Sequence, residues 1–183
     1  MKHTQQKVNI QYYQSPCGEL VLASSGGELC LCDWNFMPCA ERNRRRLARM
    51  LGASFSEEPS EVLRETAAQL DEYFAGQRRA FSIPLRTVGT DFQKRVWNIL
   101  AGIPYGQTTS YKEVAVKADN PKGVRAVAQA VGANGISIII PCHRVIGSDS
   151  SLTGFAGGLE AKRMLLQMEA AVKAGTLHGR ENP

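Results

Sequence analysis

The sequence lacks any hydrophobic run long enough to cross a membrane. Its longest apolar stretch, from Ile136 to about Pro141, is far shorter than the roughly 20 residues that a transmembrane helix needs. The opening segment MKHTQQKVNIQYYQS has no apolar stretch of signal-peptide length. Internal repeats, low-complexity tracts and long linkers are also missing. These absences argue against a membrane-spanning or secreted protein, and we expect a cytoplasmic one.

Acidic residues are in the minority. Asp and Glu number 17 against 22 Lys and Arg, which gives a formal net charge of +5. Hydrophobic residues make up 43% and charged residues 21% of the 183 residues, values that exclude an intrinsically disordered chain. This length suits one domain or two small ones. The positive charge leans weakly toward a polyanionic partner such as nucleic acid.

Paired cysteine motifs are absent as well. The five cysteines form an odd set without an export signal, so we expect free thiols rather than disulfides. Cys17, Cys30, Cys32 and Cys39 leave a four-thiolate zinc site open, but their spacing does not match the usual CxxC pairs. A structural role is the favoured interpretation for these four, and we expect no metal.

Up to about Leu85, the sequence predicts a small sheet followed by two helices. Gly26-Gly27 is typical of a hairpin turn, because glycine accepts the positive φ that such turns require. The second helix carries an apolar stripe and ends before Gly76. The predicted strands are Val8–Tyr13, Glu19–Ala23 and Glu28–Trp34, and the predicted helices are Ala40–Leu51 and Glu61–Phe74.

Beyond about Thr90 the sequence predicts a set of helices. Thr90 or Asp91 can cap a first helix that Pro104 stops, and Ser110 with Glu113 forms a capping box. Two short helices separated only by a turn suggest a helix-turn-helix. The predicted elements are helices Tyr111–Ala118, Pro121–Ala133 and Leu159 to about Val172, a strand-like segment Ile136–Ile140, and a frayed tail from Gly175.

Cys142 is the most informative single residue. His143 and Arg144 follow it, and positive neighbours favour a nucleophilic thiolate. A histidine can supply the base that activates a thiol, and a carboxylate can orient that histidine. Adjacent residues of a strand face opposite ways, so a close thiol and imidazole require a turn or a bridging water. A buried structural cysteine beside a surface histidine is the alternative.

The second half of the chain resembles the O6-alkylguanine-DNA alkyltransferases, also called methylated-DNA–protein-cysteine methyltransferases. Their signature Pro-Cys-His-Arg-Val occurs here at Pro141–Val145. The resemblance extends from about Thr90 to Glu169, and the first half fits only loosely. The other matching segments are Phe92–Trp97, Ile103–Gly106, Ser110-Tyr111, Asn120–Val127, Asn134, Thr153–Leu159 and Lys162–Glu169.

The resemblance implies a catalytic role for five residues. Cys142 would attack the alkyl carbon on O6 of a damaged guanine, and the stable thioether would make the transfer stoichiometric and irreversible. His143 would take the thiol proton through a bridging water, and Glu169 would orient that histidine. Asn134 would brace the turn before the active site, and Tyr111 would hydrogen-bond the guanine. This chemistry implies no cofactor.

The resemblance also implies a base pocket. Tyr111, Phe155 and the carbonyls of Cys142 and Val145 would surround the guanine, with the backbone N–H of Ala156 near O6. Phe155 replaces the tyrosine of many relatives, which preserves stacking but removes a hydroxyl. The preferred alkyl group and activity on O4-alkylthymine are therefore left open.

DNA would be bound by the second helix of the helix-turn-helix. The resemblance implies that this helix enters the minor groove and that Arg125 replaces a nucleotide flipped out of the stack. Such binding should be salt-sensitive and weakly sequence-selective. The arginines from Arg42 to Arg49 could touch DNA phosphates, but a solvated helix face is the favoured interpretation. The implied DNA-binding residues are Arg125, Ala126, Gln129, Gly132 and Ala133.

The expected fold is α/β in two parts. A ribonuclease-H-like domain with a small antiparallel sheet, residues 1–85, would precede a helical, winged-helix-like domain, residues 90–174, with a tail at 175–183. The expected protein is a monomer that repairs double-stranded DNA containing alkylated guanine. Two rivals are a DNA-binding module without chemistry, which the presence of Cys142 disfavours, and a cysteine hydrolase or redox protein, which would regenerate its thiol.

Overall fold

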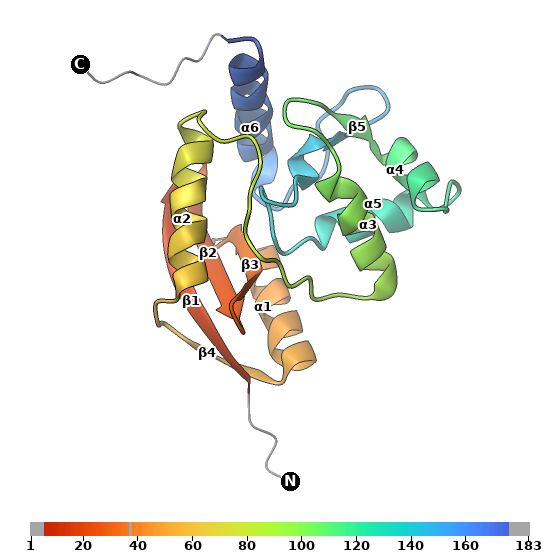
Figure 1. Ribbon diagram of the computed structural model, residues 1–183. Coiled ribbons are helices and arrows are strands. Elements are labelled where there is room, and N and C mark those ends of the chain that lie inside the picture. The colour runs from red at the N-terminus through yellow and green to blue at the C-terminus, as the bar shows by residue number, and fades with distance from the viewer. Residues whose placement is uncertain (1–5, 37, 176–183) are drawn as a thin grey trace, which may run out of the picture.

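The computed structural model describes residues 6–36 and 38–175, and its ribbon is drawn in Figure 1. Most of the predicted tail therefore lies outside the described residues. In chain order the elements are β1 (Gln6–Ser15), β2 (Gly18–Ser25), β3 (Glu28–Trp34), α1 (Pro38–Leu51), β4 (Ala53–Ser56), α2 (Glu61–Phe74), α3 (Asp91–Ala101), β5 (Thr109–Ser110), α4 (Tyr111–Lys117), α5 (Val124–Gly132), the 3-10 turn η1 (Cys142–Arg144), β6 (Val145–Ile146) and α6 (Gly158–Lys173).

The first part of the chain is a four-stranded sheet in the order β3-β2-β1-β4. The three predicted strands pair antiparallel, and Gly26 and Gly27 take the expected positive φ of 61° and 81° at the turn between β2 and β3. The sequence analysis missed β4, which adds parallel to β1. Its four residues are too few to display an alternating pattern.

The two faces of the sheet are covered by different helices. Successive residues of a strand point to opposite faces. Leu20 and Leu22 of β2 accordingly share a core with α2, whereas Val21 and Ala23 share a core with α1. Figure 1 shows α2 along one side of the sheet and α1 on the other. The core on the α2 side continues into the second part of the chain and reaches Cys142.

The free edge of β3 joins the two parts of the molecule. Cys32 donates its backbone N–H to the carbonyl of Gly135 at 2.8 Å, and Ser137 donates back to the carbonyl of Cys32 at 2.7 Å. The connector after α2 adds a bond from Leu29 to the carbonyl of Pro84 at 2.8 Å. These bonds pair the edge of β3. An unpaired edge strand would be a template for aggregation, so the pairing protects this part of the sheet.

The helices α3 and α4 begin where side-chain caps predict. Thr90, rather than Asp91, caps α3 in a full capping box with Gln93, and Ser110 forms the predicted box with Glu113 for α4. The predicted start of the next helix at Pro121 is wrong. Residues 120–123 form a turn, and α5 begins at Val124 because Gly123 has a non-helical backbone, with φ −95° and ψ 34°.

The segment Ile136–Ile140 is a buried turn, and its prediction as a strand is wrong. Only Ile136 makes an isolated bridge, to Cys32. Ile138 takes a φ of 71°, which no strand tolerates and which is rare for a β-branched residue. The apolar run reflects burial on every side rather than extended backbone.

No helix in the described part of the chain could span a bilayer.

Candidate active site

Cys142 and His143 lie in the 3-10 turn η1, which follows Pro141. The sequence left open whether this segment is a strand or a turn, and the structure shows a turn. The side chain of Cys142 is 4% exposed and that of His143 is fully buried. A reacting group must therefore be inserted among the neighbours of the sulfur to reach it.

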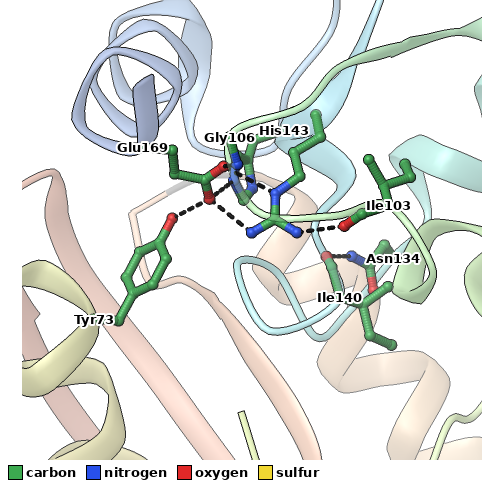
Figure 2. Close-up of polar contacts among 8 residues, drawn as sticks. Tyr73, Ile103, Gly106, Asn134, Ile140, His143 and Glu169 are labelled. Carbon is green, nitrogen blue, oxygen red and sulfur yellow. Dashed lines mark hydrogen bonds and ion pairs between the residues drawn. The ribbon is translucent and has the colours of Figure 1, made fainter. Parts of the chain in front are cut away.

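Glu169 of α6 is the centre of a buried hydrogen-bond network, shown in Figure 2. Its Oε1 lies 2.8 Å from Nε2 of His143 and accepts the hydroxyl of Tyr73 at 2.7 Å. The guanidinium of Arg144 binds both carboxylate oxygens, each at 2.9 Å. The backbone N–H of Gly106 completes the set at 3.0 Å from Oε2. Five donor atoms from three segments of the chain thus fix one carboxylate.

This network settles the protonation of its members. Burial acts to raise the pKa of Glu169, but the hydrogen bonds from His143 and Arg144 outweigh burial and hold that pKa well below its usual range. Burial lowers the pKa of His143 below its ordinary 6.5, although Glu169 opposes the change. The imidazole is therefore neutral at pH 7. Its Nε2 donates to the carboxylate, and Nδ1, which has no partner among the described residues, carries the free lone pair.

The expectation that Arg144 makes the surroundings of Cys142 electropositive is wrong. Its guanidinium is tied to Glu169 and to the carbonyl of Ile103, at 2.6 Å from the latter. Burial raises the pKa of the Cys142 thiol above its ordinary value, a shift that Asn134 and Lys162 oppose. The resting side chain is a thiol, so a base is needed to remove its proton.

Asn134 braces the turn that leads to Cys142. Its Nδ2 donates to the carbonyl of Ile140 at 2.9 Å, and its Oδ1 accepts the backbone N–H of Ile136 at 3.0 Å. One side chain thus closes both ends of the buried turn, and its position agrees with the expected bracing role. A buried turn has unpaired backbone groups that some side chain must satisfy.

The predicted base-pocket residues gather around the loop 153–157. The hydroxyl of Tyr111 donates to the carbonyl of Thr153 at 3.2 Å. Lys162 donates to the same carbonyl at 2.9 Å and to that of Val145 at 2.6 Å. Phe155 packs edge-to-face on Trp34, with ring centroids 5.0 Å apart. The two halves of the chain therefore both support this loop.

The predicted DNA-binding residues divide into an exposed stripe and one buried residue. Arg125, Ala126, Gln129 and Gly132 are exposed and repeat at helical spacing along one face of α5, and we call them the α5 stripe. A Cβ placed on Gly132 would meet nothing within 4 Å. Ala133 does not belong to this face, because its side chain is buried against the core.

Sequence reasoning missed three contributors to the site. Tyr73 lies 96 positions from Glu169, and no sequence pattern links them. Gly106 contributes a backbone N–H, which any residue type can supply. Lys162 is fully buried and donates to two carbonyls of the site. The sequence could have indicated it, because Lys162 begins one of the segments that resemble the alkyltransferases. Among the described residues, no cluster of three or more His, Cys, Asp or Glu side chains could hold a metal ion.

Two family models match the chain. The DNA binding domain of 6-O-methylguanine DNA methyltransferase matches residues 91–171, and the ribonuclease-like domain of the same name matches residues 8–87. A methylated-DNA–protein-cysteine methyltransferase of Methanosarcina barkeri is 45% identical over 156 residues, which cover 85% of this chain and 93% of that protein. One of Haemophilus influenzae is 43% identical over 159 residues, covering 86% and 84%.

Solved structures agree with these matches. The crystal structure of Mycobacterium tuberculosis O6-methylguanine methyltransferase is similar with a TM-score of 0.76 and 38% identity, covering 90% of this chain and 93% of that one. The same organism's protein in complex with DNA has a TM-score of 0.77 and 37% identity, covering 91% and 94%. The expected mixed α/β fold, with a small sheet before a helical part, is thereby confirmed.

Proposed function

The chain belongs to the 6-O-methylguanine DNA methyltransferase family, and from this membership we propose that Cys142 accepts the alkyl group from O6 of alkylated guanine in DNA. The protein is a DNA-repair enzyme of the methylated-DNA–protein-cysteine methyltransferase class.

The observation that carries the proposal is that a neutral, buried imidazole and a buried thiol belong to consecutive residues of one 3-10 turn. His143 donates through Nε2 to Glu169, so Nδ1 is the ring atom left to accept a proton. Cys142 needs such a base, because burial keeps its sulfur protonated. Glu169 stabilises the imidazolium that forms, as a buried carboxylate does for a catalytic histidine.

The reaction balances without any further reagent. The proton of the thiol moves to Nδ1 of His143 through a bridging water, and the sulfur attacks the alkyl carbon. A C–S bond forms while the bond between that carbon and O6 breaks, and its electron pair goes to the guanine. The base gains a proton from the hydroxyl of Tyr111 and leaves neutral, and the proton held on His143 returns to Tyr111 through solvent, so that both side chains end as they began. The net result is a thioether on Cys142 and ordinary guanine.

The burial of the sulfur requires the base to leave the duplex. With only 4% of its side chain exposed, Cys142 is beyond the reach of a stacked guanine. We propose that the α5 stripe enters the minor groove and that Arg125 takes the place of the everted nucleotide. Eversion costs a few kcal/mol, and less where the lesion weakens pairing.

The transfer is stoichiometric in this proposal. Removing the alkyl group from the thioether would require the sulfur to leave as a thiolate, which is a poor leaving group. Each molecule, acting as a monomer, therefore repairs one base. Phe155 offers its ring face for stacking on the guanine and no hydroxyl for a hydrogen bond to it.

The test is an intact-mass measurement after mixing the protein with duplex DNA that carries O6-methylguanine. We expect a gain of one methyl group per chain, located on the peptide that holds Cys142. Cys142→Ala is the matched control and should gain nothing while still binding the duplex.

The rival functions give different results in the same experiment. A non-catalytic lesion-binding module binds the duplex and gains no mass. A cysteine hydrolase releases its product and returns to the starting mass. Either outcome with the unmodified protein contradicts the proposal.

A further inference from the structure

Four arginines of α1 share one face of that helix, and we call them the arginine stripe. Arg42, Arg45, Arg46 and Arg49 repeat at intervals of three and four residues. The pairs Arg42–Arg46 and Arg45–Arg49 place like charges four residues apart, which destabilises a helix. The ion pair of Arg45 with Glu41 is the one salt bridge of this stripe within the described residues. Helix stability therefore does not explain the stripe.

The arginine stripe lines a groove of about 750 Å³ between α1, α3 and the end of α5. Gln93 and Ala133 contribute to the other side of this α1 groove. Arg42 donates to the carbonyl of Gly132 and Arg46 to that of Ala133, both at 2.8 Å. These bonds satisfy carbonyls left free at the end of a helix. They also hold the groove directly beyond the end of α5.

The position of the α1 groove makes it a continuation of the α5 stripe. Gly132 is the last member of that stripe, and the next residue along the chain already lines the groove. Arg45 and Arg49 are exposed, and within the described part of the chain neither side chain hydrogen-bonds to α5. Burial lowers the pKa of Arg46, and the positive charge of Arg42 lowers it further. A bound anion would relieve this repulsion.

We propose that the α1 groove binds the phosphate backbone of the DNA that flanks the base held at Cys142. Guanidinium groups match the geometry of phosphate oxygens, and such contacts position a protein on DNA without reading sequence. This inference rests on the proposed function. It extends the DNA contact from the helical part of the chain to α1, an element of the ribonuclease-like part.

The test compares Arg49→Gln with Arg64→Gln in a Cys142→Ala background. Arg49 lies in the groove and holds no carbonyl of α5, whereas Arg64 is an exposed arginine of α2, the helix on the opposite face of the sheet. Binding of a fluorescent O6-methylguanine duplex is measured across a range of salt concentrations. Loss of one phosphate contact reduces the slope of log K against log salt by about 0.9.

We expect that reduction for Arg49→Gln and an unchanged slope for Arg64→Gln. Arg49→Glu should weaken binding further than Arg49→Gln. Equal slopes for Arg49→Gln and Arg64→Gln overturn the proposal. So does an Arg49→Gln variant that loses only cooperativity between protein molecules, because the groove would then bind a second copy.

A second measurement separates this inference from the proposed function. With Cys142 present, both arginine variants are mixed with free O6-methylguanine base, which needs no DNA contact. Equal methyl gain shows that fold and chemistry are intact, so a changed salt slope belongs to the groove. Failure of the unmodified protein to gain methyl from duplex DNA contradicts the proposed function instead, whatever the slopes are.

Discussion

A single buried carboxylate organises the chemistry of this protein. Glu169 is fully buried and accepts bonds from His143, Arg144, Tyr73 and Gly106. A buried charge is tolerable only when it is paired and its remaining lone pairs are satisfied. The same contacts that stabilise the carboxylate set the tautomer of His143, so structure and reactivity share one group.

Replacing Glu169 should therefore cost stability as well as activity. Glu169→Gln leaves the buried guanidinium of Arg144 without a counter-ion, and removing one partner of a buried pair costs about 3–5 kcal/mol. The measurement is the free energy of unfolding in urea. Glu160→Gln on the exposed side of α6 is the control and should change it by less than about 0.5 kcal/mol. Similar losses in the two variants would contradict the central role of Glu169.

The lowered pKa of His143 predicts the pH dependence of methyl transfer. Burial lowers this pKa below 6.5, so the imidazole is the free base at neutral pH. The single-turnover rate should be level from about pH 7 to 8 and fall about tenfold per unit once the imidazole is protonated. Rates are measured with O6-methylguanine duplex from pH 5 to 9. A tenfold rise per unit up to pH 9 would instead indicate that bulk hydroxide ionises the thiol.

Asp33 gives a second pH-dependent prediction. Burial raises its pKa from 3.8 to about 6, despite bonds from Asn43 and the backbone of Trp34. The folded state binds this proton more tightly than the unfolded state does. Protonation of Asp33 therefore stabilises the folded protein fully below about pH 4, and this stabilisation is lost as the pH rises through 6. Two pKa units correspond to about 3 kcal/mol.

Asp33→Asn should remove this loss. Asp33 now accepts a bond from Nδ2 of Asn43, so after a flip of the Asn43 amide the new amide can donate to Oδ1 of Asn43, which has no partner among the described residues. The stability of the variant relative to the unmodified protein should therefore increase between pH 4 and pH 7, as measured by urea unfolding. Asp119→Asn, at an exposed position, should show no such trend. A pH-independent difference for Asp33→Asn would contradict the buried carboxylate.

Among the elements, α5 is the one that we propose to approach DNA closely. It ends in Gly132, whose missing side chain leaves open space on the α5 stripe. Gly132→Ala should raise the free energy of unfolding by about 0.4–1 kcal/mol, because the unfolded chain loses freedom. The same methyl group should weaken binding to duplex DNA.

Gly102→Ala is the matched control. Gly102 caps α3 with a φ of −83°, and an added Cβ would make ordinary contact with the carbonyl of Ile99 at 3.4 Å. It should stabilise the fold to a similar extent and leave DNA binding unchanged. Equal DNA affinity for both variants, in a binding assay with undamaged duplex, would argue against α5 as the contact.

Elements with local signals were predicted well, and those without them were not. The cap at Thr90, the capping box at Ser110 and the glycine pair at the hairpin depend on neighbours in sequence, and all three are present. The turn at Ile136–Ile140 depends on the side chain of Asn134 and on pairing with Cys32, which lies about a hundred positions away. No local pattern contains that information.

The whole molecule shares one core across its two family domains. Leu20, Leu22 and Trp34 from the sheet pack in the same cluster as Val96, Leu100 and Val114 from the helices. The backbone bonds between β3 and the turn at Ile136–Ile140 join the same parts. We therefore expect the two halves to unfold together, although the family models match them separately.

The two tryptophans test this expectation, because one lies in each half. Trp97→Phe leaves Trp34 to report on β3, and Trp34→Phe leaves Trp97 to report on α3. In each variant the urea midpoint from tryptophan fluorescence should coincide with the midpoint from far-UV circular dichroism. Separate midpoints in either variant would show that the halves unfold independently.

By itself, the sequence determined the helices with caps, the hairpin, and the thiol–histidine pair within Pro141–Val145, because those features depend on residues close along the chain. Tertiary structure alone decided that Arg144 serves Glu169 rather than the sulfur, that Tyr73 and Lys162 belong to the site, and that the arginines of α1 adjoin α5. Each of these depends on burial and on contacts between distant segments, which exist only once the sheet and helices have packed.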